Sequence, residues 1–234
     1  MEQPNFPNTN AGSRAAIQQS MMQRVFLWMF AGLSMTAIIA VVLNSTQDVP
    51  KMLMESPGLF WGVIIAELAV VFGLSFLINR LSVFAATFGF FLYAALNGIT
   101  FTLILARFEL GTIGAAFFIA AGMFGIFAVF GYVTKIDLSK IGSIALMVLL
   151  GLIIASIVNF FFISYEPMNL IISYALVVLI SIITAWDIQK IKSYGAEAQT
   201  EEQAAKFAIF GALMLYLDFI ILFKNILYIL NSDD

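Results

Sequence analysis

Two aspartates, Asp187 and Asp218, lie where a charge is hardest to accommodate. Asp187 is found in AWDIQKIK and Asp218 in LYLDFIILF, and both stretches belong to apolar segments long enough to cross a bilayer. A charged carboxylate at the centre of a membrane costs about 3 kcal/mol on insertion scales, so intramembrane acids face a partner, a cavity or a pathway. Two such acids that lie close together share a proton, because both cannot ionise cheaply. The pair is therefore the leading candidate site and a candidate pH sensor.

The composition places the chain in a membrane. Hydrophobic residues make up 62% and charged residues 11% of its 234 residues, and the mean hydropathy is +1.01. Such values lie far outside the usage of soluble globular domains. The formal net charge of -3 leaves no basic surface for nucleic acid. We therefore expect an all-α integral membrane protein whose immediate surroundings are the lipid bilayer.

Cysteine and histidine are both absent from the sequence. Disulfides, thiolate nucleophiles, His-ligated zinc or haem and Ser-His-Asp triads are thereby excluded. Histidine is the usual side chain that titrates near neutral pH, so any pH response in that range depends on carboxylates. We expect neither enzymatic activity nor a resident cofactor.

Apolar runs separated by short linkers predict seven membrane-spanning helices. Residues 1–23 are polar and predict a mobile cytoplasmic tail, whereas residues 24–234 predict a single membrane domain. The segment from Gln189 to Lys206 is the most polar internal stretch and reads as a loop. In the fourth span, Ala121, Gly122 and Gly125 predict close helix packing. The expected spans are Val25 to Leu43, Gly58 to Ile78, Val83 to Ala106, Thr112 to Tyr132, Ile141 to Ile163, Met168 to Ile188 and Phe207 to Leu230.

Lysine and arginine are distributed unevenly along the chain, which predicts its orientation. With seven spans, one side of the membrane carries eight of the eleven cations: Arg14, Arg24, Arg80, Lys135, Lys140, Lys190, Lys192 and Lys206. The other side has Lys51, Arg107 and Lys224. We expect Lys224 to extend toward the far interface, and a role in an ion pathway is the alternative. The amino terminus is therefore expected in the cytoplasm and the carboxyl terminus outside.

Polar residues within other spans mark a candidate ion pathway. Glu67 lies near the middle of the second span, and Asn97 and Thr100 follow helical spacing in the third. Asn225 lies seven residues beyond Asp218 on the last span. Such side chains face protein or water rather than lipid.

Four stretches resemble the Bax inhibitor-1 family, and the similarity is closest to its bacterial members. They are AWDIQKIK, LYLDFIILF, TKIDLS and ALNGITFTLI. The resemblance implies seven helices, six of them around a central seventh, in the inner membrane of a bacterium. It also implies a pH-sensitive calcium leak whose di-aspartyl sensor is Asp187 and Asp218. Arg80, at the end of the second span, is the candidate for the family's basic latch onto this pair.

Calcium also suits the side chains themselves, since it is a hard cation that binds oxygen ligands. Asp187 and Asp218 are expected to contact calcium weakly and transiently, because a leak passes its ion rather than holding it. Calcium is then a permeant ion and not a cofactor.

Three other functions fit parts of the sequence. A membrane-embedded regulator of a membrane-bound protease, or of stress and cell-death pathways, would need a membrane-protein partner and no ion conduction. An intramembrane aspartyl protease is disfavoured, because Leu215, Tyr216 and Leu217 stand where its GxGD signature would precede Asp218. A proton-coupled transporter would need substrate contacts that the sequence does not show.

Overall fold

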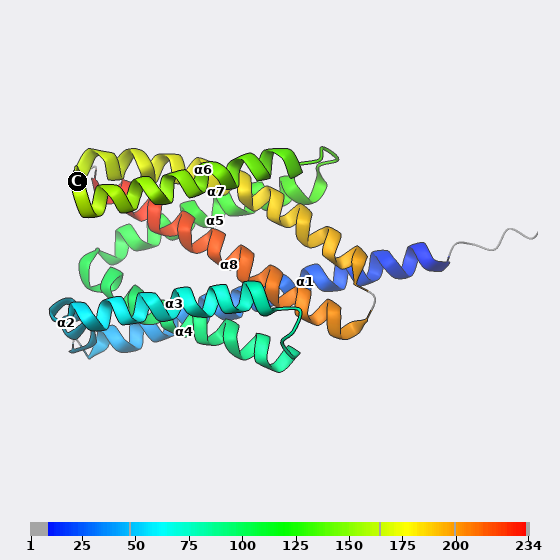
Figure 1. The fold of residues 1–234 in the computed structure, drawn as a ribbon, viewed down its shortest axis with the longest axis horizontal. Helices are drawn as coiled ribbons and strands as arrows, with labels where there is room; N and C mark the ends of the chain where they lie inside the picture. The colour runs from blue at the N-terminus through cyan, green and yellow to red at the C-terminus, as the bar shows by residue number, and fades with distance from the viewer. Residues whose placement is uncertain (1–8, 47, 164, 199, 233–234) are drawn as a thin grey trace, which may run out of the picture.

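The computed structural model describes residues 9–46, 48–163, 165–198 and 200–232, and every regular element within them is helical (Figure 1). Within these residues, seven helices are long and apolar enough to cross a membrane, which confirms the expected all-α fold with seven spans. In chain order the helices are α1 (Thr9–Ser45), α2 (Asp48–Glu55), α3 (Pro57–Leu77), α4 (Val83–Arg107), α5 (Leu110–Val133), α6 (Ser139–Val158), the π-helical turn η1 (Asn159–Ile163), α7 (Glu166–Glu197) and α8 (Glu201–Ser232).

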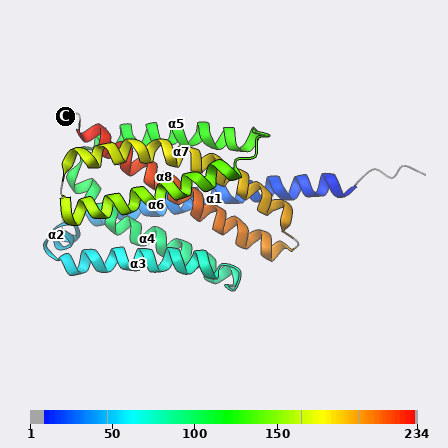
Figure 2. The same ribbon diagram turned by 45° about the horizontal axis from the view of Figure 1, so that its top comes forward.

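The last helix, α8, occupies the centre of the bundle. Inside its most apolar stretch 67% of the residues are buried, against 11% to 44% for the other six spans. It runs between a group formed by α1, α3 and α4 and a group formed by α5, α6 and α7 (Figure 1). Helices α1, α4, α5 and α7 pack directly on α8, whereas α3 packs mainly on α4 and α6 mainly on α7. Figure 2 shows α3 at the outer edge of the bundle accordingly.

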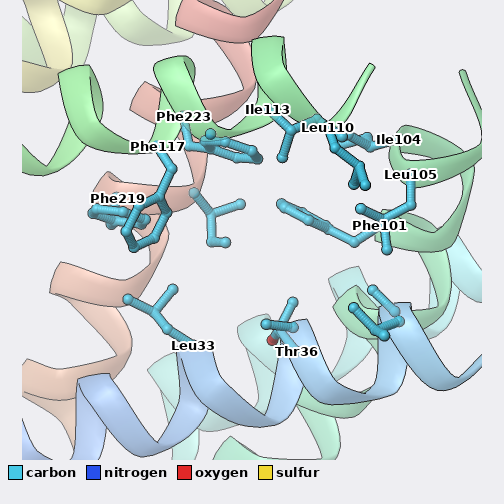
Figure 3. Close-up of a pocket in the computed structure, with 15 residues that line it drawn as sticks. Leu33, Thr36, Phe101, Ile104, Leu105, Leu110, Ile113, Phe117, Phe219 and Phe223 are labelled. Carbon is cyan, nitrogen blue, oxygen red and sulfur yellow. The ribbon is translucent and has the colours of Figure 1, made fainter. Parts of the chain in front are cut away.

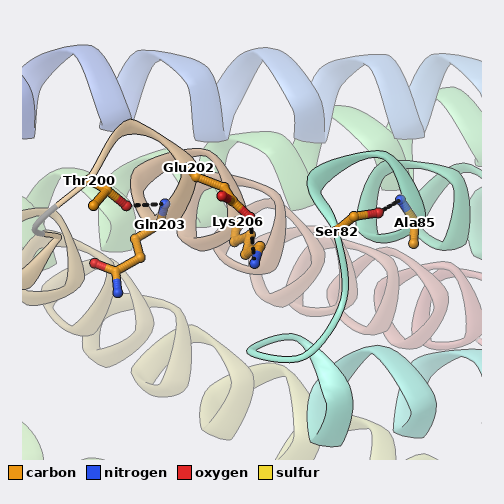
Figure 4. A network of polar contacts seen from close by, with 6 residues as sticks. All are labelled: Ser82, Ala85, Thr200, Glu202, Gln203 and Lys206. Carbon is orange, nitrogen blue, oxygen red and sulfur yellow. Dashed lines mark hydrogen bonds and ion pairs between the residues drawn. The ribbon is translucent and has the colours of Figure 1, made fainter.

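The connections alternate between the two ends of the bundle. The α3–α4, α5–α6 and α7–α8 connections lie at the end where α1 begins, called the amino-terminal end, and the carboxyl terminus lies at the other (Figure 1). Short side chains fix two of these connections (Figure 4). The Ser82 hydroxyl accepts the Ala85 amide at 3.2 Å, and the Thr200 hydroxyl accepts the Gln203 amide at the same distance. Such N-terminal caps satisfy amides that a helix start leaves unpaired.

Two segments extend further as helix than the sequence predicts. Helix α1 begins at Thr9, so the expected tail is helical from that residue on, and Met21 and Met22 are buried. Residues 1–8 of that tail lie outside the described residues. The expected loop from Gln189 to Lys206 is mostly the polar ends of α7 and α8. An ion pair between Lys206 and Glu202 at 2.9 Å, four residues apart on α8, favours this extension (Figure 4).

Close helix packing occurs at glycines other than the ones expected. A β-carbon at Gly122 or Gly125 would meet nothing within 4 Å, so the packing role predicted for these glycines of α5 is wrong. A β-carbon at Gly131, near the end of α5, would instead overlap the backbone carbonyl of Ala185 on α7. One at Gly142 on α6 would overlap the Trp186 ring. Two glycines therefore seat α5 and α6 against the residues that directly precede Asp187.

Candidate functional site

The two aspartates come together at the contact between α7 and α8. Asp187 is 7% exposed and Asp218 is 5% exposed, although both are acids. The Asp187 carboxylate lies close enough to interact electrostatically with Asp218. One Asp218 oxygen, Oδ2, is buried and has no hydrogen-bond partner among the described residues. A buried oxygen without a donor suits a carboxyl group that takes its proton from a shared site or its contact from a passing cation.

The neighbouring side chains on α7 give this pair only limited support. Thr184, three residues before Asp187, lies beside Asp218, and its hydroxyl donates to the Ile180 carbonyl at 2.8 Å. Lys190 interacts electrostatically with Asp187, and its ammonium lies 4.8 Å from the centre of the Trp186 ring. In the part of the chain that the structure describes, no lysine or arginine side chain forms an ion pair with Asp187 or Asp218.

Arg80 forms no ion pair with either aspartate among the described residues. Its side chain is exposed at the turn between α3 and α4, and its backbone amide donates to the Leu77 carbonyl at 2.8 Å. The cation beside Asp187 is instead Lys190, one helical turn away on the same helix. That spacing is the signal by which the sequence identifies Lys190, because residues three apart on a helix are neighbours.

A second polar group joins α3 to α4. The Thr100 hydroxyl donates to Glu67 Oε1 at 3.0 Å, and Glu67 is only 8% exposed. The Thr100 hydroxyl also lies 2.9 Å from the backbone carbonyl of Asn97. The side-chain amide of Asn97 donates to the Tyr93 carbonyl at 3.3 Å. Three of the four expected pathway residues, Glu67, Asn97 and Thr100, therefore form one cluster.

Lys224 on α8 borders this cluster. It interacts electrostatically with Glu67, and its ammonium lies 5.0 Å from the centre of the Phe101 ring, next to Thr100 in the chain. The fourth expected residue, Asn225, is bonded within its own helix, where its side-chain amide donates to the Ile221 carbonyl at 2.8 Å. Glu67 also interacts electrostatically with Tyr216 of α8, so its two partners on that helix lie on either side of Asp218 in the chain.

A third group of polar contacts links α1, α4 and α8 beside the pair. The Tyr216 hydroxyl lies 2.7 Å from the Thr36 hydroxyl, which also lies 2.8 Å from the Ala94 carbonyl. The Tyr216 ring packs edge-on against Phe90 and Tyr93, and the residue is fully buried. Tyr216 is two residues before Asp218, so this network fixes the rotation of α8 about its own axis at the site. The one signal in the sequence is Thr36 itself, a hydroxyl within an apolar span.

Another aspartate, Asp137, lies outside the pair. It belongs to the connection between α5 and α6, at the amino-terminal end of the bundle. The hydroxyl and the backbone amide of Ser139 both hydrogen-bond to it and hold its pKa below the ordinary value. It therefore stays ionised around neutral pH. Asp187 and Asp218 differ in this respect, because two buried acids that lie close together can share a proton.

No group of three or more acidic, histidine or cysteine side chains that could hold a metal ion occurs in the described residues. The aspartate pair together with Glu67 offers separate oxygen contacts rather than a cage. Tight calcium binding needs six to eight oxygen ligands around one ion.

These features define a polytopic α-helical membrane protein in which a central helix and its neighbour bury a carboxylate pair. The family model described as inhibitor of apoptosis-promoting Bax1 matches residues 18–234. The chain therefore belongs to the Bax inhibitor-1 family, which confirms the resemblance seen in the four sequence stretches.

Full-length relatives support this assignment. The inner membrane protein YbhL of Escherichia coli K12 is 39% identical over 231 residues, covering 97% of this chain and 98% of the relative. An uncharacterized protein of Deinococcus radiodurans is 38% identical over 216 residues, covering 92% of each chain. One from Borreliella burgdorferi is 35% identical over 217 residues, covering 92% of this chain and 93% of the relative.

Proposed function

We propose that this protein is a pH-sensitive calcium leak of the inner membrane, gated by Asp187 and Asp218. The observation that carries the proposal is the buried carboxylate pair at the contact between α7 and α8, in which Asp218 Oδ2 has no donor among the described residues. A purely structural acid would be hydrogen-bonded throughout, since an unsatisfied buried polar atom destabilises a fold. An acid that exchanges protons and cations needs a free lone pair.

The polar groups offer calcium two separate contacts. The Glu67 cluster lies between α3 and α4, whereas the aspartate pair lies between α7 and α8. Separate contacts of this kind favour conduction, because an ion that binds weakly at several points also leaves. In this proposal the described arrangement is the closed one, because Asp187, Asp218 and Glu67 are all buried in it. Opening would require α8 and its neighbours to separate at these acids.

Purified protein in liposomes loaded with a calcium-sensitive dye tests the proposal directly. We expect calcium entry above that of protein-free vesicles, with a rate that changes between about pH 6 and 8 as the shared proton is lost. Flux equal to that of empty vesicles at every pH would end the channel proposal. The family's other expected role, regulation of a membrane protein without conduction, would then lead.

Glu67→Gln is expected to lower calcium flux several-fold and to leave its pH response in place. Glutamine retains an oxygen that can accept the Thr100 hydroxyl but carries no charge to attract the ion. The aspartate pair is unchanged by this substitution. Dye-loaded liposomes measure both properties, with Ser75→Ala as the control, since Ser75 is exposed on the same helix and its hydroxyl donates to the Val71 carbonyl of that helix. Unchanged flux in Glu67→Gln would remove Glu67 from the pathway.

Arg80→Ala is expected to raise flux at high pH, if deprotonation of the pair lets the Arg80 side chain close onto it. The exposed position of Arg80 in the closed arrangement makes this a demanding test. Lys140→Ala is the matched control, because Lys140 is an exposed cation at the same end of the bundle. Identical pH profiles for Arg80→Ala and the unmodified protein would leave Lys190 as the cation that acts on Asp187.

The proposed topology places the amino-terminal end of the bundle in the cytoplasm. The excess of cations at this end supports it. A reporter enzyme that works only outside the cytoplasm is expected to be active when fused after Asp234. One that works only in the cytoplasm is expected to be active when inserted beside Gln199. Both positions lie outside the described residues, so neither insertion interrupts a described helix. The opposite pattern would invert the direction of the proposed pathway.

A further inference from the structure

An apolar cavity of about 340 Å³ lies between α1, α4, α5 and α8 (Figure 3). Side chains from all four helices point into it, including Leu33 of α1, Phe101 of α4, Phe117 of α5 and Phe219 of α8. The cavity exists because α5 packs on α7 and α8, while α1 packs on α4 and α8. None of the described helices fills the space on this side of α8, between α5 and the α1–α4 pair. None of the three buried acids of the proposed pathway lines the cavity.

The lining offers nothing to a polar ligand or to water. Among the described residues, Thr36 is its one polar side chain. The Thr36 hydroxyl is already engaged by the Ala94 carbonyl at 2.8 Å, the Gly32 carbonyl at 3.1 Å and the Tyr216 hydroxyl at 2.7 Å. A buried water needs two to four polar partners, and an apolar cavity of about 150 Å³ stays dry and binds benzene. This larger cavity therefore selects hydrocarbon.

The rim of the cavity is continuous with the surface that faces lipid. Val41, Leu110 and Phe117 line it and are 60%, 76% and 46% exposed. Its floor is formed by residues of α8, of which Phe219 and Phe223 are each 5% exposed. Every helix around it is a membrane span, so the medium at the rim is bilayer hydrocarbon. A chain entering from that medium would reach the floor without crossing a polar group.

We propose that this cavity is a binding site for one acyl chain of a membrane phospholipid, which enters between α5 and the α1–α4 pair. The chain fills space that no described helix fills and packs against the central helix. Its headgroup stays at the membrane surface next to Leu110, at the start of α5. In the proposed topology this is the outer leaflet. A free fatty acid has the same chain chemistry, and lipid photocrosslinking distinguishes the two.

Photocrosslinking of a lipid tests the site. The protein is placed in vesicles of phosphatidylethanolamine and phosphatidylglycerol that contain a small fraction of phosphatidylethanolamine with a diazirine midway along one acyl chain. After illumination, mass spectrometry maps the adducts. We expect adducts on the floor residues Phe219 and Phe223, which a lipid confined to the outer surface does not reach.

A glycine in the cavity wall provides a variant that fills the site. A β-carbon at Gly114 would meet nothing within 4 Å, so Gly114→Phe places a ring in the cavity without displacing the backbone. We expect it to reduce floor adducts by about tenfold, because a close-packed interior leaves no second space for the chain. Gly122→Phe is the matched control. Gly122 is on the same helix, is equally free of neighbours and lies outside the cavity, so its floor adducts are expected to remain.

Three outcomes would overturn the proposal: adducts on exposed residues alone, equal floor adducts in Gly114→Phe and in the unmodified protein, or floor adducts from a diazirine fatty acid but not from the phospholipid. If Gly114→Phe does not fold, Ala37→Leu takes its place, since it narrows the cavity from the opposite wall on α1. It is expected to reduce the floor adducts in the same way, and equal floor adducts would overturn the proposal.

Discussion

Asp187→Asn and Asp218→Asn, made separately, are each expected to flatten the pH dependence of calcium flux between about pH 6 and 8. Each substitution leaves one carboxyl group without its partner, so the shared proton is lost whichever acid is changed. The expectation does not depend on whether acid opens or closes the pathway. Flux measured in dye-loaded liposomes across this range reports the result.

Asp137→Asn is the matched control for both variants. Asp137 is exposed in the connection between α5 and α6, and Ser139 keeps it ionised around neutral pH. Its replacement is expected to leave the pH profile unchanged. A normal profile in both Asp187→Asn and Asp218→Asn would show that the pair is not the sensor, whatever its burial.

Gly131→Leu is expected to destabilise the protein strongly. The new side chain would occupy the position of the Ala185 carbonyl, and backbone cannot rotate away as a side chain can. Overpacking in a core typically costs about 1 to 3 kcal/mol, and a forced separation of α5 from α7 belongs at the upper end or beyond. Thermal unfolding of the purified protein in detergent, followed by loss of the monodisperse species, measures the change.

Gly122→Leu gives the comparison that isolates this contact. It lies on the same helix and makes the same chemical change in open space, so we expect its midpoint of unfolding to stay close to that of the unmodified protein. Gly142→Leu is expected to fall between the two, since it meets the Trp186 side chain rather than backbone. Equal midpoints for Gly131→Leu and Gly122→Leu would contradict the close approach of α5 to α7.

Hydropathy predicted the spans well because each apolar run must match the thickness of hydrocarbon. The same argument failed at polar helix ends, where hydrocarbon sets no limit. Helix α7 therefore continues to Glu197, and α1 begins at Thr9, beyond the expected boundaries. The burial of Asp187 and Asp218 could also be predicted, because the cost of a charge in lipid depends on the residue and its span and not on knowing which helices are its neighbours.

Partnerships between helices were harder to predict, since they depend on helix rotation and not on composition. Gly122 and Gly131 are alike in the sequence, but only the second faces α7. Lys224 of α8 interacts electrostatically with Glu67 of α3, and nothing in the sequence indicates that pairing. The contact between Thr36 and Tyr216 joins residues that are 180 positions apart, and nothing in a single sequence indicates that these two residues meet.

The central position of α8 has a consequence for how the protein is made. Helix α8 leaves the ribosome after the six helices that surround it or pack on its neighbours, so those helices enter the bilayer before their common centre exists. Asp218 and Lys224 would be costly in open lipid. Their helix instead enters a membrane that already contains Asp187, Glu67 and Thr36 as neighbours. The bundle is thus completed in one late step, and a ribosome that stalls before α8 leaves six spans with their inward faces uncovered.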